Sequence, residues 1–275
     1  MRGWRWLWTA AVVSVHLAGS GSAAAAPAAG SSERAIDALV EQSHQRLQQR
    51  QVTEGYQTLL RAVLLAEESN LPARAAALAA DAGDLALLLG DWPEAEQRFL
   101  QAVQRGAQAS DPFAEARGQH GLARIYRRVG RYDEALRAAH RSVTLTRQHP
   151  DRSAHAAAHN EMAAVCSAMG RLDDAKKLLR RAIEIDEAAG NRPGVAHQRT
   201  DLAAAHLSAG ELAEAEALLD ALATLVEEPA MAHLGGRVYS NRGSLAVARG
   251  DWERAVTELR RAREFADRSG DVVAM

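Results

Sequence analysis

The sequence predicts an all-α fold, an α-solenoid of about six antiparallel helix pairs, from three observations. The chain of 275 residues is rich in Ala and Leu, and only 4% of its residues are aromatic. Val, Ile and Thr, which favour strands, are sparse, whereas Ala is the strongest helix former. A glycine recurs at a constant interval, and apolar residues before each glycine follow a helical spacing. Stacked helical hairpins satisfy all three observations.

The constant interval is forty residues, and it defines the repeating unit. The sequences that begin at these glycines are similar to one another, for example Gly-Arg-Tyr-Asp-Glu-Ala from Gly130 and Gly-Arg-Leu-Asp-Asp-Ala from Gly170. A worn copy precedes the others, with Arg50 in the place of the glycine. The five glycines are Gly90, Gly130, Gly170, Gly210 and Gly250. Counting in forties gives six units, at residues 36–75, 76–115, 116–155, 156–195, 196–235 and 236–275.

Each unit is expected to contain two helices. Apolar residues before the glycine, such as Leu122 and Tyr126 before Gly130, recur at the spacing of an amphipathic helix. The glycine ends this helix because it can adopt the left-handed conformation of a C-terminal cap. Asp133 and Asp173 are the expected N-caps of second helices. One side chain in each second helix is expected to fill the space between helices: Phe99, Ala139, Leu179, Leu219 and Leu259.

The repeat unit resembles the tetratricopeptide repeat family, whose pattern is Leu/Gly-x-x-Tyr, a turn glycine and then Ala-x-x-x-Phe. The matching residues are Leu122, Ala123, Tyr126, Gly130 and Ala135, with Ala95 and Phe99 in the second unit. The unit is longer than the usual thirty-four residues and lacks the late Pro and early Trp, so it resembles the variant of kinesin light chains and bacterial arrays. The resemblance covers residues 36–275. It implies a right-handed superhelix that binds peptides or partner proteins in its concave groove.

The N-terminal segment follows the plan of an export signal. Arg2 and Arg5 precede an apolar stretch of about a dozen residues, which is shorter than a membrane-spanning helix. A tract of small residues follows, so we expect a cleaved signal peptide at residues 1–28 and a short linker at 29–35. This predicts a periplasmic or secreted protein with no membrane span after cleavage. The alternative is an uncleaved membrane anchor.

No residue pattern predicts catalysis, a metal site or a cofactor. The chain has no phosphate-binding glycine loop, no nucleophile elbow and no pair of closely spaced cysteines. Its net charge of -2 gives no basic excess for nucleic acid. Cys166 is expected to be a buried structural thiol, and His206 a packed residue with a hydrogen bond. His155 and His159 stand four residues apart, but no third ligand is specified, and we interpret them as surface residues.

The candidate partner-binding surface is the concave groove, which the resemblance assigns to the first helix of each unit. The first helix of the third unit is strongly basic there, and equivalent places in later units carry Asn. The candidate binding residues are Arg117, His120, Arg124, Arg127, Asn160 and Asn241. Asp81, Asp84, His197, Asp201 and Arg237 occupy equivalent places in other units. Because a guanidinium binds carboxylates by forked hydrogen bonds, we expect a protein or peptide ligand with an acidic segment or a C-terminal carboxylate.

These observations favour a non-catalytic exported scaffold or adaptor that binds a peptide or partner protein. One alternative is the sensing or regulatory arm of a split or truncated peptidase-type enzyme. Another is a self-assembling envelope component, because no polar capping helix follows the last unit and solenoids normally need one for solubility.

Self-association through the C-terminal end is tested by measuring the mass in solution. A self-assembling chain buries its apolar end against another copy, so light scattering is expected to give a multiple of the chain mass of 29.5 kDa. A mass equal to one chain at all concentrations would favour the monomeric adaptor.

Overall fold

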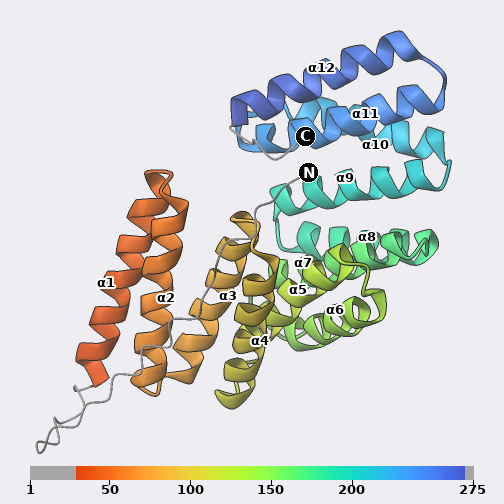
Figure 1. The fold of residues 1–275 in the computed structure, drawn as a ribbon. Coiled ribbons are helices and arrows are strands. Elements are labelled where there is room, and N and C mark those ends of the chain that lie inside the picture. Colours follow the sequence, from red (N-terminus) through yellow and green to blue (C-terminus); the bar gives the residue numbers. More distant parts are fainter. Residues whose placement is uncertain (1–28, 270–275) are drawn as a thin grey trace, which may run out of the picture.

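The computed structural model describes residues 29–269, and within them it contains twelve α-helices and one short 3-10 helix. The helices follow one another in a stack, from α1 at one end to α12 at the other (Figure 1). They are α1 (Ala29–Gln48), α2 (Val52–Glu68), α3 (Pro72–Leu88), α4 (Trp92–Gln108), α5 (Pro112–Arg128), α6 (Tyr132–Thr146), α7 (Arg152–Ala168), α8 (Leu172–Ala188), α9 (Arg192–Ser208), α10 (Leu212–Leu225), η1 (Pro229–Leu234), α11 (Gly235–Ala248) and α12 (Trp252–Ser269). The described residues therefore form the expected α-solenoid.

The two helices of each pair run antiparallel, and the pairs contact their neighbours in a regular way. Each second helix packs against the first helix of the next pair, as α4 does against α5 and α8 against α9. First helices of successive pairs, from α3 to α11, also contact one another. Since the first helices are the ones that approach each other, they form the inner, concave side of the solenoid.

The turns within the pairs are fixed by left-handed residues. Gly90, Gly130, Gly170, Gly210 and Gly250 all have positive φ values, between 75° and 80°. Arg50, in the worn copy, adopts the same conformation with a φ of 60°. A side chain with a Cβ is strained there, which explains why glycine recurs in the other five turns. The prediction that these glycines end the first helices is confirmed.

A second set of left-handed residues lies in the turns between pairs. Asn70 and Ser110 have φ values of 54° and 52°, and Gly190 has 70°. Pro150 occupies the equivalent place after α6, where its ring holds φ near −65°. A proline cannot adopt the left-handed turn, and α6 accordingly ends early, at Thr146, in a longer connection.

The helix starts differ from those expected in two places. α6 and α8 begin after Arg131 and Arg171, which make no side-chain cap, so Asp133 and Asp173 lie in the first helical turn. The N-cap prediction for these two aspartates was therefore wrong. Side-chain caps occur where an Asp or Asn directly precedes the helix, at Asp91, Asp111, Asp151, Asn191 and Asp251. Asp173 instead forms an ion pair with Lys176, whose Nζ lies 3.0 Å from Asp173 Oδ1.

The core is a chain of apolar clusters between neighbouring helices. The predicted space-filling residues Phe99, Ala139, Leu179 and Leu219 are all at most 2% exposed. Leu259 is the exception, with 48% of its surface exposed. It lies in α12, the last described helix, where no further helix pair within residues 29–269 covers it.

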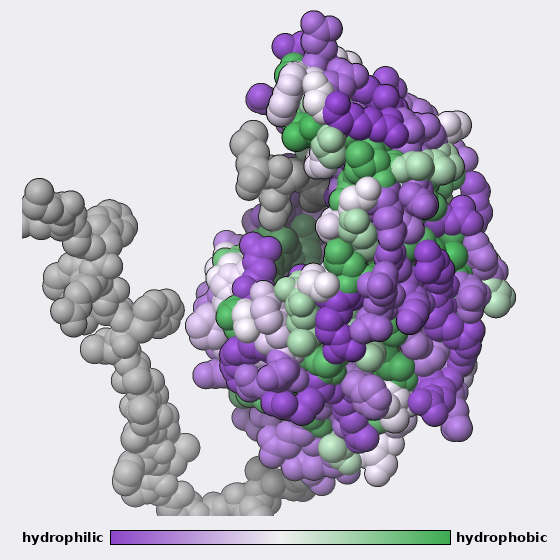
Figure 2. Space-filling view, turned by 90° about the vertical axis from the view of Figure 1, so that its right-hand side faces the viewer, coloured by the Kyte–Doolittle hydropathy of each residue, from purple (hydrophilic) through white to green (hydrophobic). Residues whose placement is uncertain are grey.

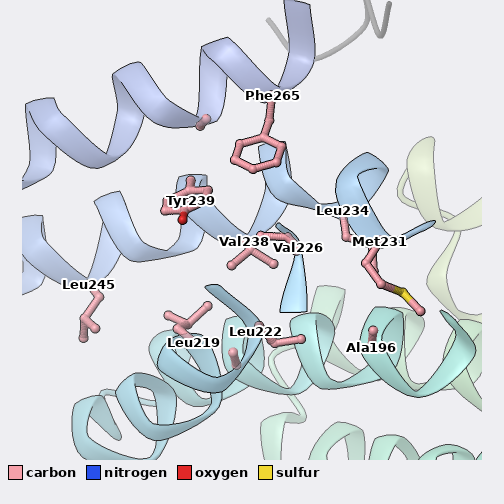
Figure 3. Packing of buried hydrophobic residues seen from close by; sticks show 12 residues of the cluster. Ala196, Leu219, Leu222, Val226, Met231, Leu234, Val238, Tyr239, Leu245 and Phe265 are labelled. Atoms are coloured by element: carbon pink, nitrogen blue, oxygen red, sulfur yellow. The ribbon is translucent and has the colours of Figure 1, made fainter. Parts of the chain in front are cut away.

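The last core cluster shows how the regular pattern changes at the fifth pair. α10 is short and η1 follows it before α11 begins. Figure 3 shows Met231 of η1 pointing toward Ala196 of α9, and Phe265 of α12 over Tyr239 of α11. The two rings are stacked with centroids 5.3 Å apart. The extra turn thus fills the space beside the shortened helix.

The second to fifth helix pairs begin four residues before the unit boundaries counted from the glycines. They start at residues 72, 112, 152 and 192, whereas the boundaries fall at 76, 116, 156 and 196. Residues 29–35, expected to be a linker, belong to α1. The expected signal peptide at 1–28 and the last six residues of the sixth unit lie outside the described residues. Between residues 29 and 269, no helix combines the length and the apolar character needed to cross a membrane.

The two kinds of turn give a matched test of the backbone. We expect Gly130→Ala to lower the free energy of unfolding by about 1 kcal/mol, because alanine is strained at this φ. Ser110→Gly removes a similar strain and is expected to raise it by up to about 1 kcal/mol, less the entropy that glycine gains in the unfolded chain. Urea denaturation followed by circular dichroism measures both changes. Equal effects of the two substitutions would contradict the left-handed turns.

Candidate functional site

The concave side of the solenoid carries a broad cleft across four first helices. It has a volume of about 550 Å³, and we call it the α7–α9 cleft because those two helices form its floor. Arg127 of α5 and Arg237 of α11 stand at its two ends. Its lining residues are Arg127, Asn160, Glu161, Ala164, Ser167, Ala168, Leu179, His197, Asp201, Ala204, Ala205, Ser208 and Arg237. Hydrophilic and hydrophobic residues alternate on the face in Figure 2, so apolar surface is exposed in small patches.

A smaller hollow of about 240 Å³ lies beside the cleft, over α5. We call it the α5 hollow. Three of the predicted binding residues, Arg117, His120 and Arg124, line it. Its other lining residues are Asp84, Phe113, Ala116, Gly121, Ser142, Thr146, Ala154 and Ala157. The structure thus brings the four basic α5 residues and Asn160 to two adjacent depressions, whereas Asn241 lines neither of them.

The arginines of α5 are paired with carboxylates of neighbouring first helices. Arg117 donates to Asp81 at 2.6 Å and Arg124 donates to Asp84 at 2.8 Å. The predicted basic band is therefore largely compensated by the acidic residues of α3. These arginines are still 31% and 40% exposed, so they can reach a ligand.

Arg127 also pairs with a carboxylate, but with one on α7, which follows α5 in the stack, rather than on α3. Its Nε donates to Oε1 of Glu161 on α7 at 2.8 Å. The Glu161 side chain is only 8% exposed, and its burial raises the pKa of the carboxyl while Arg127 lowers it. Burial likewise raises the pKa of Asp84 against the opposing effects of Arg124 and Arg117. The groove therefore contains one buried carboxylate, Glu161, and one half-exposed carboxylate, Asp84, each beside a guanidinium.

Glu161 is the groove residue that the sequence pattern misses. It follows Asn160 directly and occupies a position that counts as part of the buried face of α7. The sequence feature that could have indicated Glu161 is its separation from Arg127, which is 34 residues and so somewhat less than one repeat. Arg117 and Asp81 are similarly separated by 36 residues, and Arg124 and Asp84 by 40.

His120 is uncharged at neutral pH. Burial among three arginines lowers its pKa to about 4, with desolvation the largest cause and Arg124 the next. The candidate site at α5 therefore presents two guanidinium groups and a neutral imidazole, which can both donate and accept a hydrogen bond.

Asp201 organises the other half of the cleft. It accepts hydrogen bonds from Asn160 Nδ2 at 3.1 Å and from Arg237, and His197 Nε2 lies 3.4 Å away. The remaining polar atom of the amide, Asn160 Oδ1, is buried and has no hydrogen-bond partner among residues 29–269. Asn241 donates to the backbone carbonyl of Thr200 at 3.2 Å and thus ties α11 to α9.

The structure also decides the other singled-out residues. Cys166 is 1% exposed and His206 is 6% exposed with a hydrogen bond to Glu211, so both predictions are confirmed. The interpretation of His155 as a surface residue was wrong, since it is 5% exposed and contacts Thr146 Oγ1 at 3.1 Å. It packs edge-on against His159, and no cluster of metal-ligating side chains forms anywhere in the described part of the chain.

Comparison with known families gives a direct match to the repeat. A tetratricopeptide repeat model matches three overlapping stretches, residues 74–148, 114–188 and 153–228. A second tetratricopeptide repeat model matches residues 236–261. No curated protein matches the chain in sequence.

Solved structures share the fold at low sequence identity. BtubC (BKLC) from P. vanneervenii is 18% identical, with 89% of this chain and 93% of that chain covered and a TM-score of 0.57. A Rap protein complexed with competence and sporulation factor is 12% identical, with 85% and 75% covered and a TM-score of 0.61. The Rap conjugation gene regulator of the plasmid pLS20, in complex with its Phr peptide, is 14% identical, with 86% and 76% covered and a TM-score of 0.61.

The lowered pKa of His120 predicts a loss of stability in acid. Because the folded pKa of about 4 lies below the unfolded value of 6.5, protonation favours the unfolded chain as the pH falls from about 6.5 toward 4. Between pH 7 and pH 5 the His120 contribution is on the order of 1–2 kcal/mol. We expect His120→Asn to lose correspondingly less stability than the parent over this interval, measured by urea unfolding at both pH values. Equal losses would show that His120 titrates normally.

Proposed function

Because the chain belongs to the tetratricopeptide repeat family, we propose that it is a non-catalytic adaptor that binds a peptide segment of a partner protein along its concave side. The observation that carries this proposal is the α7–α9 cleft, which crosses α5, α7, α9 and α11 and so follows the groove lengthwise. A cleft of this shape suits an extended chain.

The floor of the cleft is suited to the close approach of a peptide backbone. Small side chains line it on both helices, at Ala164 and Ser167 of α7 and at Ala204 and Ser208 of α9. Asn160 lies among them, and its buried, unpartnered carbonyl oxygen becomes an acceptor for a ligand N–H group when the side chain turns toward the cleft. The site thus offers room and unmet hydrogen-bonding capacity.

The structural neighbours support the same general role. Two Rap proteins of similar fold are described in complex with a factor or a peptide. At these identities the likeness concerns the fold alone, so the site residues of this chain are inferred from its own cleft.

The cellular site of the proposed adaptor is inferred from residues 1–28. Their positive start, apolar stretch and small-residue tract support export to the periplasm or the exterior. The role of a sensing arm for a peptidase-type enzyme stays a prediction.

Self-association is a second candidate function, favoured by one observation. α12 exposes a stripe of apolar side chains at Trp252, Val256 and Leu259, which are 66%, 48% and 48% exposed. Equivalent residues inside the stack are covered by the next pair, as Leu219 is. A second copy of the chain would cover the stripe in the same way.

Blocking the cleft tests the proposed adaptor function. Ligands selected from a random library of peptides of about twelve residues on the full chain are expected to bind at least about tenfold more weakly to Ala164→Trp, because the indole fills the floor of the cleft. Fluorescence polarisation measures the affinities. Ala221→Trp, at an exposed position of α10 outside the cleft, is the matched control. Undiminished binding to Ala164→Trp would place the peptide site elsewhere.

A further inference from the structure

The charged residues of the α7–α9 cleft occur in a defined order along the groove. Arg127 comes from α5, Glu161 from α7, Asp201 from α9 and Arg237 from α11. Along the stack the order is therefore basic, acidic, acidic, basic. Of these four residues, only Arg127 belongs to the arginines that the sequence predicts to bind an acidic ligand.

Each of the two carboxylates forms an ion pair with the arginine at its own end of the cleft. Arg127 contacts Oε1 of Glu161 at 2.8 Å, and Arg237 contacts Oδ1 of Asp201. Glu161 and Asp201 face each other closely enough that the charge of Asp201 raises the pKa of Glu161. His197 stands beside Asp201, but burial lowers its pKa, so it adds no positive charge at neutral pH. The middle of the cleft is therefore acceptor-rich.

A separate observation points to a donor-bearing ligand at the same place. Asn160 lies beside Glu161 in the chain and already donates to Asp201 through Nδ2. Its Oδ1 is buried and has no partner within the described residues. An unsatisfied buried acceptor is unfavourable, so Asn160, which lines the cleft, gains a hydrogen bond when it turns Oδ1 toward a ligand N–H group.

The two ends of the cleft have the opposite character. Arg127 and Arg237 are 31% and 47% exposed, and each carries five N–H donors, more than its contacts to Glu161 and Asp201 employ. Their guanidinium groups can donate hydrogen bonds to a carboxylate of the ligand while they remain paired within the protein.

We propose that the ligand segment carries a basic side chain over Glu161 and Asp201, flanked by acidic side chains over Arg127 and Arg237. This inference rests on the proposed peptide-binding function and names the chemistry of the ligand. It replaces a uniformly acidic segment by one whose charges alternate.

The packing of helices sets the spacing of these charges. Neighbouring packed helices lie about 8–10 Å apart, so the three steps from α5 to α11 span roughly 27 Å. An extended chain advances about 3.3 Å per residue. The two acidic residues of the ligand should thus be about eight residues apart, with the basic residue near the middle.

Three probe peptides of identical composition test the order of charges. Each has about eleven residues, mostly Ala and Ser, with two Glu and one Lys at positions about four apart. The orders are Glu-Lys-Glu, Glu-Glu-Lys and Lys-Glu-Glu, so net charge is constant. We expect the Glu-Lys-Glu peptide to bind the full chain at least about fivefold more tightly at low ionic strength. The difference should shrink at about 1 M salt, where the Debye length is about 3 Å.

Variants of the protein locate the preference. Glu161→Gln combined with Asp201→Asn should abolish the advantage of the Glu-Lys-Glu order. Glu184→Gln, which removes an exposed ion pair with Arg181 on α8, is the matched control and should keep it. Circular dichroism checks that each variant is folded, and the comparison of the three peptides on the parent chain stands without any variant.

The outcomes separate this inference from the proposed function. Equal affinities for the three orders, all lost in Ala164→Trp, would overturn the charge order and leave peptide binding in the cleft intact. Failure of all three probes to bind would also overturn it, while ligands selected from the random library still decide the proposed function. A preference for a terminal Lys would reverse the assignment of the charges.

Discussion

A helix pair in this chain cannot bury its own apolar face, and every other feature depends on the contact with the next pair. Phe99 of α4 shows the constraint most clearly, because its ring lies between the first helices on both sides. A Cβ on Gly83 of α3 would lie 2.6 Å from this ring, and one on Gly121 of α5 would lie 2.3 Å from it. The two glycines thus leave space for one large side chain, which joins two pairs into one packed unit. Leu259 of α12, beyond which residues 29–269 contain no further helix pair, shows the same position uncovered, with 48% of its surface exposed.

The stacking also brings charges from different units together. Ion pairs on the concave side connect residues 34 to 40 positions apart, such as Arg127 with Glu161 and Arg237 with Asp201. Ion pairs that stay exposed to solvent, such as Arg124 with Asp84, contribute little to stability, typically below about 1 kcal/mol. Their larger consequence here is for recognition, because they arrange acidic and basic groups in a defined order along one groove. The basic residues of a single helix thus become, in the stack, part of a surface that carries both basic and acidic groups.

The candidate site illustrates which properties follow from a single helix and which do not. The position of Arg117, Arg124 and Arg127 off the apolar stripe follows from the periodicity of one helix, and all three line the two depressions. Their pairing with carboxylates, the neutral state of His120 and the burial of Glu161 depend on side chains from neighbouring helices. The burial of His155, interpreted from sequence as exposed, has the same origin, since Thr146 of the preceding helix contacts it.

The sequence by itself determined the helix pairs, their number and the position of their turns, because glycine at positive φ and apolar spacing act within a few residues. It also determined which helix faces the groove, through the family resemblance. The tertiary structure alone decided that His155 and Glu161 are buried and which charges are compensated. The physical reason is the sequence distance over which the interactions act. Backbone preferences depend on neighbouring residues, whereas burial and electrostatics depend on groups that only packing brings together.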